Sequence, residues 1–567
     1  MSNLWFESAL LPDGWATGVR LTLAQGRIER IDIGTAPHDT DERHSIGVPG
    51  LPNLHSHAFQ RGLAGLTERR GPTGDSFWTW RELMYRFVER LEPEGLEAIA
   101  ALVYAEMLEG GFTHVGEFHY LHHDQDGTQF ANPGELAGRI AAAAETTGIG
   151  LTLLPTFYAH SGFGGAEPTP RQRRFINDVD SFARVVEASR SAVRGLPGAV
   201  VGVAPHSLRA VTSEELKGVV KIAQGEVIHI HIAEQTKEVQ DCLAWSGRRP
   251  IEWLLENQAV DERWCLVHAT HATDAEVAGM ATSKAVVGLC PITEANLGDG
   301  IFPAPPFLEQ GGRFGVGSDS NVSLDAADEL RVLEYSQRLA QRARNVLARA
   351  EGQSTGRSLF EAALLGGAQA LNARGGGPTH GGAAAFGATA SQPGGPRYGG
   401  ATAFGATGSQ AGGFQHAGTA VSAGATASQP GGPRYGGAAA FGATGSQAGG
   451  PQHGSAAMSA SATAPQPGGP RHGGAAAPGV TAPQAVGSQT PGLKVGASAD
   501  VVSLAADHPA LAERREDEIL DSWIFTGGRS VVDCVWRAGV KVVINGRHPR
   551  RDELLARYRR TLKGLLA

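Results

Sequence analysis

Short runs of β-branched and other apolar residues alternate along this chain with longer segments whose apolar residues recur every three or four positions. The runs predict strands and the segments between them predict helices, such as PEGLEAIAALVYAEMLEGG, which stops at a glycine pair. Eight strands are expected, in LPNLHSH, FTHVGEFHY, GIGLTLLPTF, AVVGVAPHS, EVIHIHIAE, WCLVHATH, AVVGLCP and RFGVGSDSN. Strands that alternate with helices in this way predict an α/β protein with a closed (β/α)8 barrel, whose site lies at the carboxyl ends of its strands.

The two ends of the chain have a different pattern. Residues 1–48 and 493–545 contain alternating, valine-rich runs such as RLTLAQGRIERIDIG and VVDCVWRAGVKVVINGR. We expect these segments to form one small β-sandwich domain built from both termini. The barrel then occupies residues 49–373, and residues 546–567 form a C-terminal helix.

Residues 374–492 interrupt this pattern with a Gly/Ala/Pro-rich repeat. The motif QPGGPR begins at Gln392, Gln429 and Gln466, and residues 375–492 hold 32 of the 78 glycines. A solenoid repeat needs large apolar residues to bury against its neighbours, and these units offer little beyond alanine. We therefore expect a disordered low-complexity insertion within a loop of one enzyme.

Charge and cysteine content exclude several classes of protein. The net charge is -8, and the body outside the insertion is more acidic still, which argues against a nucleic-acid partner. The start of the chain does not resemble a signal peptide, and no run approaches 18 apolar residues, so a cytoplasmic protein with no membrane partner is expected. The four cysteines form no C-x-x-C pair and are expected to be reduced and mostly buried.

Polar residues follow the predicted strands, where a barrel places its chemistry. His55 and His57 lie at i and i+2 on one strand and therefore point to the same face. His231 and Asp319 end two other strands. Three imidazoles and one carboxylate suit one Zn²⁺ per chain, or another divalent first-row ion such as Fe²⁺, with a position left for water.

Two further residues at the same end of the barrel suit proton transfer. Glu234 lies three residues after His231 and can reach a metal-activated water without binding the metal. His268 ends the next strand and can hydrogen-bond to the developing charge. A structural ion pair and a core histidine are the alternatives for these two residues. His119, His122 and His123 are expected to be solvent-facing or to support the site, and not to form a second metal site.

The run VPGLPNLHSHAFQRGLAG, together with HIAEQ, VHATH and GVGSDSN, resembles the amidohydrolase superfamily, specifically its mononuclear deaminase branch. The segments HSHAFQRGLAG and VGEFHYLHH are similar to those of the formimidoylglutamate deiminase family. The resemblance covers residues 1 to about 373 and 493–567. Binuclear members carry a lysine at the fourth strand, where this chain has APHS with His206, which favours one metal.

The resemblance implies hydrolysis of N-formimino-L-glutamate to N-formyl-L-glutamate and ammonia in histidine degradation. It implies that Glu234 shuttles the proton, that His268 polarises the substrate and that Asp319 both binds the metal and takes part in catalysis. The implied metal ligands are His55, His57, His231 and Asp319, and the implied substrate-binding residues are Gln60, Arg81, Tyr120, His206 and Arg209. The forked donors of Arg81 and Arg209 match the two carboxylates of this small-molecule substrate, although an arginine such as Arg81 is otherwise most often a surface charge.

Two other functions stay open at this point. A mononuclear-zinc deaminase of a guanine-like heterocycle would use the same metal and Glu234 but a pocket lined by aromatic and amide groups. An inactive barrel could instead act as an interaction protein through its repeat. The sequence does not decide between zinc and iron, or between a monomer and a homodimer.

Overall fold

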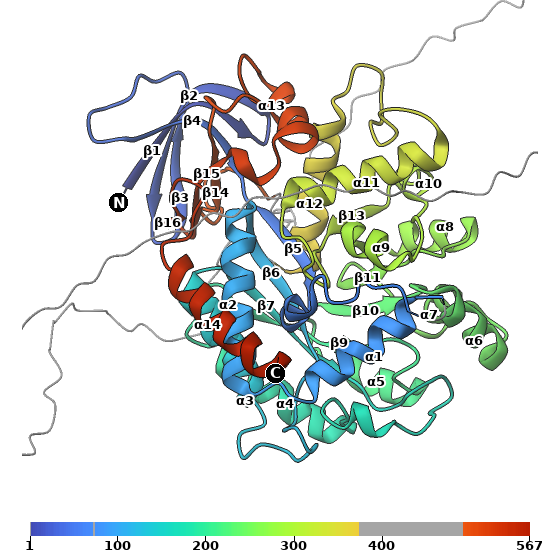
Figure 1. Ribbon diagram of the computed structural model, residues 1–567. Helices are drawn as coiled ribbons and strands as arrows, with labels where there is room; N and C mark the ends of the chain where they lie inside the picture. The colour runs from blue at the N-terminus through green and yellow to red at the C-terminus, as the bar shows by residue number, and fades with distance from the viewer. Residues whose placement is uncertain (1, 72–73, 373–490) are drawn as a thin grey trace, which may run out of the picture. The chain divides into compact units, whose positions relative to one another are not determined.

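The computed structural model describes residues 2–71, 74–372 and 491–567 (Figure 1). The predicted disordered insertion therefore lies outside the described residues, except for its last two positions. Among the helices of the described ranges, none combines the length and the apolar character that crossing a bilayer requires.

Parallel strands form the barrel at the centre of the molecule. They are β5 (Leu51–Ser56), β6 (Phe112–His119), β7 (Gly150–Phe157), β8 (Val200–Val201), β9 (Ala204–Pro205), β10 (Ile228–Ile232), β11 (Trp264–His268), β12 (Val286–Leu289) and β13 (Arg313–Val316). These strands lie in the eight predicted segments, but the fourth segment is divided into β8 and β9. One ladder runs from β5 to β8 and another from β10 to β13. Single parallel bridges, Ser56 to Asp319 and Val203 to Ile228, join the two ladders and close the ring.

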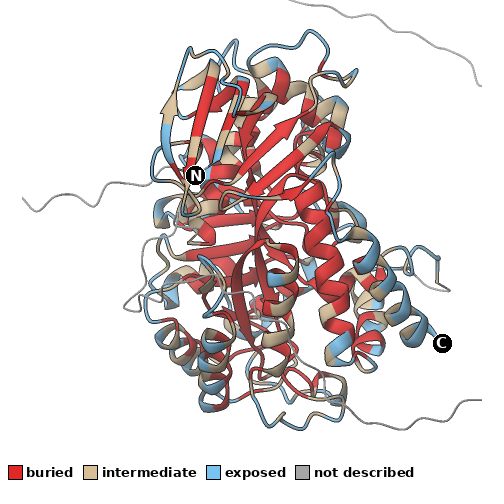
Figure 2. Ribbon diagram, turned by 90° about the vertical axis from the view of Figure 1, so that its left-hand side faces the viewer, coloured by how far each residue is buried: buried red, intermediate tan, exposed pale blue. Residues whose placement is uncertain are grey.

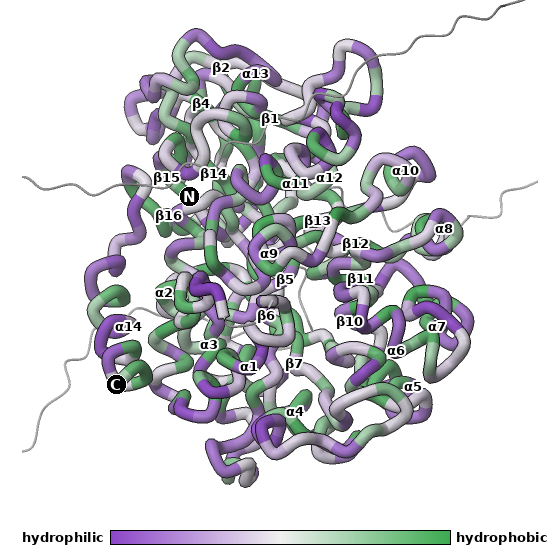
Figure 3. The backbone as a smooth tube through the Cα atoms, turned by 45° about the vertical axis from the view of Figure 1, so that its right-hand side comes forward, coloured by the Kyte–Doolittle hydropathy of each residue, from purple (hydrophilic) through white to green (hydrophobic). Residues whose placement is uncertain are grey.

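Helices surround the barrel. They are α1 (Phe77–Val88), α2 (Pro93–Glu109), α3 (Glu135–Thr147), α4 (Val179–Ala192), α5 (Ser213–Ile222), α6 (Thr236–Ser246), α7 (Pro250–Asn257), α8 (Asp274–Ser283), α9 (Pro291–Leu297), α10 (Ala304–Glu309), α11 (Ala326–Gln341), α12 (Thr355–Ala370), α13 (Asp517–Ser522) and α14 (Arg551–Leu566). Helix α2 has proline at its first position and is buried on nearly every side, because it lies between the barrel and α14. Figure 2 shows this burial as a red helix beside the red central strands. Helix α14 mixes hydrophilic and hydrophobic stretches in Figure 3, as expected of a helix with one face on α2 and the other in water.

Helix α12 closes the end of the barrel opposite the carboxyl ends of the strands. Its Gly366 lies so close to the backbone of β13 that a Cβ there would meet the Phe314 oxygen at 1.9 Å. Its last carbonyls accept hydrogen bonds from strand residues: Ala370 from His229 at 2.8 Å, and Leu371 from Thr152 at 2.8 Å. These bonds satisfy carbonyls that have no partner within the helix.

Both termini contribute to one sheet of seven strands, in the order β16-β15-β14-β4-β1-β2-β3. The strands are β1 (Ser2–Leu11), β2 (Gly14–Ala24), β3 (Arg27–Asp32), β4 (Glu42–Pro49), β14 (Val501–Leu504), β15 (Val532–Arg537) and β16 (Val540–Val543). The prediction of two stacked sheets was wrong, because β4 pairs with both β1 and β14 and so makes the ladder continuous. This sheet instead curls around its own core, and Ile28 of β3 exchanges backbone hydrogen bonds with Gly496 and Ala497 before β14.

Candidate active site

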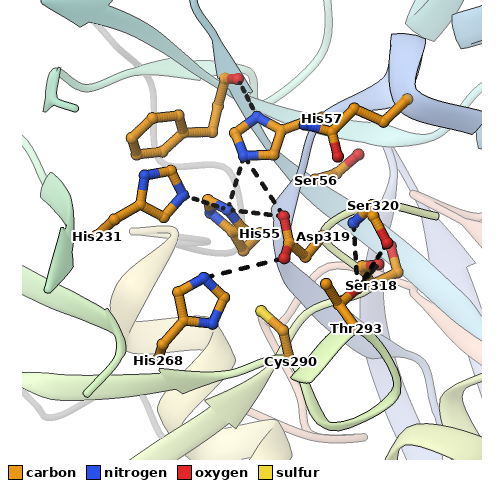
Figure 4. A network of polar contacts seen from close by, with 12 residues as sticks. His55, Ser56, His57, His231, His268, Cys290, Thr293, Ser318, Asp319 and Ser320 are labelled. Carbon is orange, nitrogen blue, oxygen red and sulfur yellow. Dashed lines mark hydrogen bonds and ion pairs between the residues drawn. The ribbon is translucent and has the colours of Figure 1, made fainter. Parts of the chain in front are cut away.

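Three imidazole nitrogens converge at the carboxyl ends of the barrel strands (Figure 4). The Nε2 atom of His55 lies 3.2 Å from that of His57 and 3.0 Å from that of His231. The Asp319 Oδ1 atom lies 3.5 Å from His55 Nε2 and 3.4 Å from His57 Nε2. All four side chains are buried. The structure therefore brings together the four residues expected to bind a metal.

The hydrogen bonds of these histidines test whether the cluster fits a cation. His57 Nδ1 lies 2.9 Å from the Phe118 carbonyl and His231 Nδ1 lies 3.0 Å from the His206 carbonyl, so each Nδ1 donates its proton and each Nε2 keeps a lone pair. Burial lowers the pKa of His55 to about 3 and that of His231 well below its usual value. Neutral nitrogens that face one another at about 3 Å repel unless a cation lies between them. The donor set thus fits a divalent first-row metal ion.

Buried polar side chains hold the loop that carries Asp319. The Asn321 side-chain amide donates to the carbonyl oxygens of His57 and Asp319, both at 3.0 Å, and its oxygen accepts from Ser318 at 2.6 Å. Asn53 on β5 donates to the Ser318 hydroxyl at 2.6 Å. These bonds connect the two strand ends that carry three of the four residues expected to bind a metal, and they fix the distance between these strand ends.

Glu234 lies beside the cluster and is almost fully buried. Its backbone N–H donates to Glu238 Oε2 at 3.0 Å, and one of its carboxylate oxygens lies 3.9 Å from Arg209 Nη2. Burial raises the pKa of Glu234, while the neighbouring charges of His268 and Arg209 oppose that rise. A carboxyl group whose pKa is raised towards neutrality is suited to accept and return a proton.

His268 lies on the opposite side of the cluster from His57. Its Nε2 atom faces Asp319 Oδ2 at 3.9 Å, and its Nδ1 atom lies 3.3 Å from Glu294 Oε1. Burial lowers the pKa of His268, but the hydrogen bond to Glu294 and the charges of Glu234 and Asp319 outweigh that effect and raise it to about 10. His268 is therefore a hydrogen-bond donor at neutral pH.

One pocket opens onto this cluster, and every predicted site residue except His55 lines it. Its polar lining consists of His57, Gln60, Arg81, Tyr120, His206, Arg209, His231, Glu234, His268 and Asp319. Gln60 donates to the Tyr120 hydroxyl at 3.2 Å, and the His206 ring contacts that of Tyr158 with the ring centres 4.6 Å apart. Glu234 shares this pocket with the histidine cluster and with the guanidinium groups of Arg81 and Arg209.

The two predicted carboxylate-binding arginines reach the pocket from different elements. Arg81 comes from α1, and Arg209 follows β9. Both guanidinium groups lie over the Trp78 ring, at 4.6 Å for Arg81 and 5.7 Å for Arg209. Within the described residues, the Nε atoms of both arginines are buried without a hydrogen-bond partner. Unpaired buried donors of this kind are suited to an anionic ligand.

Several lining residues were missed by the sequence reasoning. They are mostly aromatic: Phe77, Trp80, Met84, Tyr85, Tyr158, Phe175 and Leu297. Phe77, Arg81 and Met84 are spaced at i, i+4 and i+7 and therefore lie on one helix face. This spacing could have indicated that the face that carries Arg81 lines the substrate pocket. No comparable sequence pattern identifies Tyr158 or Glu294.

The histidines of the HYLHH segment are buried, not solvent-facing as one reading expected. His122 and His123 bond to the carbonyl oxygens of Thr156 and Ile176, each at 2.8 Å. Burial lowers the pKa of both histidines. Their contacts hold the loop after β6 against the neighbouring strand and loop. All four cysteines are free and buried, as predicted.

Family models match two parts of the chain. The model described as "Amidohydrolase family" matches residues 46–387, and the model described as "Formimidoylglutamate deiminase HutF, N-terminal domain" matches residues 1–45. The first of these matches covers more than half of the chain.

Two curated relatives from Pseudomonas aeruginosa are informative. A formimidoylglutamate deiminase is 56% identical over 373 residues, which cover 65% of this chain and 82% of that protein. An 8-oxoguanine deaminase is 27% identical over 359 residues, which cover 60% of this chain and 76% of that protein. The identity to the formimidoylglutamate deiminase is therefore about twice the identity to the 8-oxoguanine deaminase.

Solved structures agree with this similarity. An amidohydrolase from Brucella melitensis is 46% identical, with a TM-score of 0.78 and complete coverage of both chains. An adenosine deaminase from Xanthomonas campestris with bound zinc is 18% identical, with a TM-score of 0.66 and coverage of 100% of this chain and 98% of that one. At that identity the second match supports the fold alone.

Proposed function

Because the chain belongs to the amidohydrolase family, whose members are metal-dependent hydrolases, we propose that it converts N-formimino-L-glutamate and water into N-formyl-L-glutamate and ammonia in histidine degradation. The observation that carries this proposal is a pair of guanidinium groups, of Arg81 and Arg209, whose Nε donors are buried and unpaired among the described residues, in a pocket that also contains Glu234 and the histidine cluster. A linear substrate with two carboxylates and one amidine satisfies all three features. The high identity to a formimidoylglutamate deiminase supports the same choice.

We assign one Zn²⁺ to His55, His57, His231 and Asp319, on the basis of their converging nitrogens and the carboxylate beside them. A divalent cation held there would lower the pKa of a bound water and would so supply a nucleophile at neutral pH. The carbonyls of Phe118 and His206 orient two of the imidazoles through their Nδ1 protons.

The substrate carboxylates are assigned to Arg81 and Arg209, with Gln60, Tyr120 and His206 as further polar contacts. Bidentate guanidinium contacts fix the length and direction of the substrate chain. They place the formimino carbon near Glu234 and His268.

In the proposed reaction, Glu234 transfers protons and His268 stabilises the developing charge. Glu234 takes one proton from the attacking water as the new carbon–oxygen bond forms, and His268 donates a hydrogen bond to the charge that develops. Glu234 delivers this proton to the terminal nitrogen of the neutral amidine, then takes the second proton from the new hydroxyl and passes it to the same nitrogen. The carbonyl forms as the carbon–nitrogen bond breaks, and ammonia leaves. The remaining formyl carbon keeps its bond to the substrate's internal nitrogen.

The decisive assay measures ammonia release from N-formimino-L-glutamate by the purified full chain. Treatment with a chelator should abolish release, and added Zn²⁺ should restore it more fully than Fe²⁺ does. Formamide and glutamate as products would show that the other carbon–nitrogen bond is cleaved. The absence of any turnover of this substrate would contradict the proposed function and favour an inactive barrel that acts through its repeat.

Deamination of a guanine-like heterocycle is the second candidate, because aromatic rings line much of the pocket. The two candidates differ at Arg209. Replacing Arg209 by methionine should raise the KM for N-formimino-L-glutamate by about 10-fold or more, because a charged hydrogen bond worth about 1.5–3 kcal/mol is lost in a closed site. An unchanged KM, together with turnover of a purine, would favour the heterocycle deaminase.

Localisation and assembly complete the proposal. We propose a cytoplasmic enzyme whose partner is its small-molecule substrate, with a homodimer as the assembly to test. Light scattering on the purified chain distinguishes a monomer from a homodimer.

A further inference from the structure

The carboxylate of Glu294 contacts Nδ1 of His268, whereas the other ring nitrogen, Nε2, faces Asp319 of the histidine cluster. We propose that Glu294 is a positioning residue that fixes the ring orientation of His268 and keeps its Nδ1 atom protonated, so that Nε2 faces the reacting atoms. This inference rests on the proposed function, since it assigns to Glu294 a role in the same reaction.

The two ring nitrogens of His268 face different carboxylates. His268 Nδ1 lies 3.3 Å from Glu294 Oε1, and the two side chains are 1% and 7% exposed. The opposite nitrogen, Nε2, lies 3.9 Å from Asp319 Oδ2. Because the two ring nitrogens point in different directions, a bond that holds Nδ1 also determines where Nε2 points.

The carboxylate is itself held in place. The same Oε1 atom accepts the backbone N–H of Cys290 at 2.9 Å, and the Glu294 carbonyl accepts the backbone N–H of Asp299 at 2.9 Å. Cys290 directly follows β12, so Glu294 is tied to the barrel next to the strand that carries His268. A carboxylate anchored in this way can orient an imidazole without moving with it.

The backbone conformation of His268 also favours a residue that holds its side chain in place. Its φ of 68° lies in the left-handed region, as does that of Ala269 at 49°. This turn directs the side chain out of the strand and into the pocket, where His268 is a lining residue. Within the described residues, the contacts of its two nitrogens are the carboxylates of Glu294 and Asp319. A buried carboxylate on Nδ1 stabilises the donor form of the ring in the way that carboxylates orient histidines in other sites.

The first test replaces Glu294 by glutamine in the zinc-loaded full chain. We expect kcat to fall by roughly 10- to 100-fold, with KM changed by less than about 3-fold and the zinc content unchanged. Glu329→Gln is the matched control, because Glu329 is equally buried and accepts a backbone N–H from the same helix, that of Ile292 at 3.0 Å. The control should keep kcat within about 3-fold. Equal losses in the two variants would contradict a specific role for Glu294.

A double-mutant cycle separates positioning from general support of the fold. If Glu294 acts through His268, adding Glu294→Gln to His268→Asn should cause little further loss of kcat, whereas independent effects would multiply. Losses that multiply would overturn the proposal. The same holds if Glu294→Gln alone keeps full activity.

NMR spectra of the histidine side chains test the proposal independently of enzyme activity. In ¹⁵N spectra of the histidine side chains of the wild-type chain, Nδ1 of His268 should carry a proton, and Glu294→Gln should alter that signal while Glu329→Gln leaves it unchanged. An unprotonated Nδ1 in the wild type overturns the proposal even where the glutamine variant does not fold. A wild type without activity on N-formimino-L-glutamate contradicts the proposed function, whereas the spectra still decide the role of Glu294.

Discussion

At the residue scale, the site depends on backbone positions that most side chains avoid. Ala233, His268, Asp319 and Asn321 have φ values of 50°, 68°, 44° and 59°. Each follows or ends a barrel strand, and each turns the chain sharply at the mouth of the barrel. Such positions cost about 1–3 kcal/mol apiece and persist where the surroundings determine them, as the hydrogen bonds of Asn321 do here.

The sequence located the residues that end strands but not those that support them. His55, His57 and His231 could be found because a strand's period and its end together determine where a side chain points. Glu294 and Glu238 could not be found in this way, since their partners are set by how helices α9 and α6 pack on the barrel. Each of them also lies on a helix whose sequence gives no sign that the carboxylate points inward.

Glu117, on β6, supports the histidine-bearing turn and gives a prediction about pH. Its carboxylate accepts the backbone N–H of Ala58 at 2.8 Å, and burial raises its pKa from 4.5 to about 7 although that hydrogen bond opposes the rise. The folded chain therefore holds this proton more tightly than the unfolded chain. Protonated Glu117 therefore contributes its whole effect to the free energy of unfolding below about pH 4.5. This contribution declines by up to about 3 kcal/mol as the pH rises to about 7.

Glu117→Gln should remove this decline. The Tm of the variant, measured relative to wild type by scanning calorimetry, should improve steadily between about pH 4.5 and 7 and then stay constant. Glu145→Gln, at an exposed position of α3, is the control and should show no such trend. A Tm difference for Glu117→Gln that is independent of pH would contradict the prediction.

At the element scale, the sequence pattern predicted the strands whose two faces are both buried. Strands β6, β7 and β10 are buried along their whole length, and β-branched or other apolar residues recur in each of them, beside the histidines of β6 and β10. The fourth segment reads as one strand, but it forms β8 and β9, because Val203 between them bridges to Ile228 of β10 while its neighbours pair with β7. The continuous terminal sheet was also missed, since pairing order is not contained in the alternation of any single strand.

Helix α1 gives the prediction at this scale, because it carries both a guanidinium and the ring beneath it. Replacing Trp78 by leucine should raise the KM for N-formimino-L-glutamate by roughly 3- to 30-fold, with kcat nearly unchanged. The reason is that contacts worth about 0.5–2 kcal/mol to Arg81 and Arg209 are lost. Trp78→Phe keeps an aromatic face and is the control, with a smaller rise. Equal effects of leucine and phenylalanine on KM would show that the ring face does not matter.

At the scale of the whole molecule, the segments on either side of the repeat lie away from the candidate active site. Asn372 lies two residues after α12, and the carbonyls of Ala370 and Leu371 just before it accept hydrogen bonds from His229 and Thr152 on the barrel strands. These carbonyls lie at one end of the barrel. The histidine cluster lies at the other end, at the carboxyl ends of the strands. The described chain resumes at Pro491 and soon enters the core of the terminal sheet through Leu493. The repeat, for which the sequence predicts disorder, therefore connects two elements that do not line the pocket.

Deleting residues 373–490 and joining Asn372 to Pro491 through a linker of about 12 Gly and Ser residues, which reaches up to about 40 Å, should leave the site intact. Zinc content and kcat should stay within about 2-fold of the full chain. The Tm should not fall, because the sequence predicts a disordered repeat, and closing a disordered loop of about 12 residues costs about 2 kcal/mol less free energy than closing one of 118 residues. The control deletes only one copy of the 37-residue repeat, from Gln392 to the position before Gln429. A folded deletion variant that fails to bind zinc would show that the repeat contributes to the site, which would contradict its treatment as a passive connection.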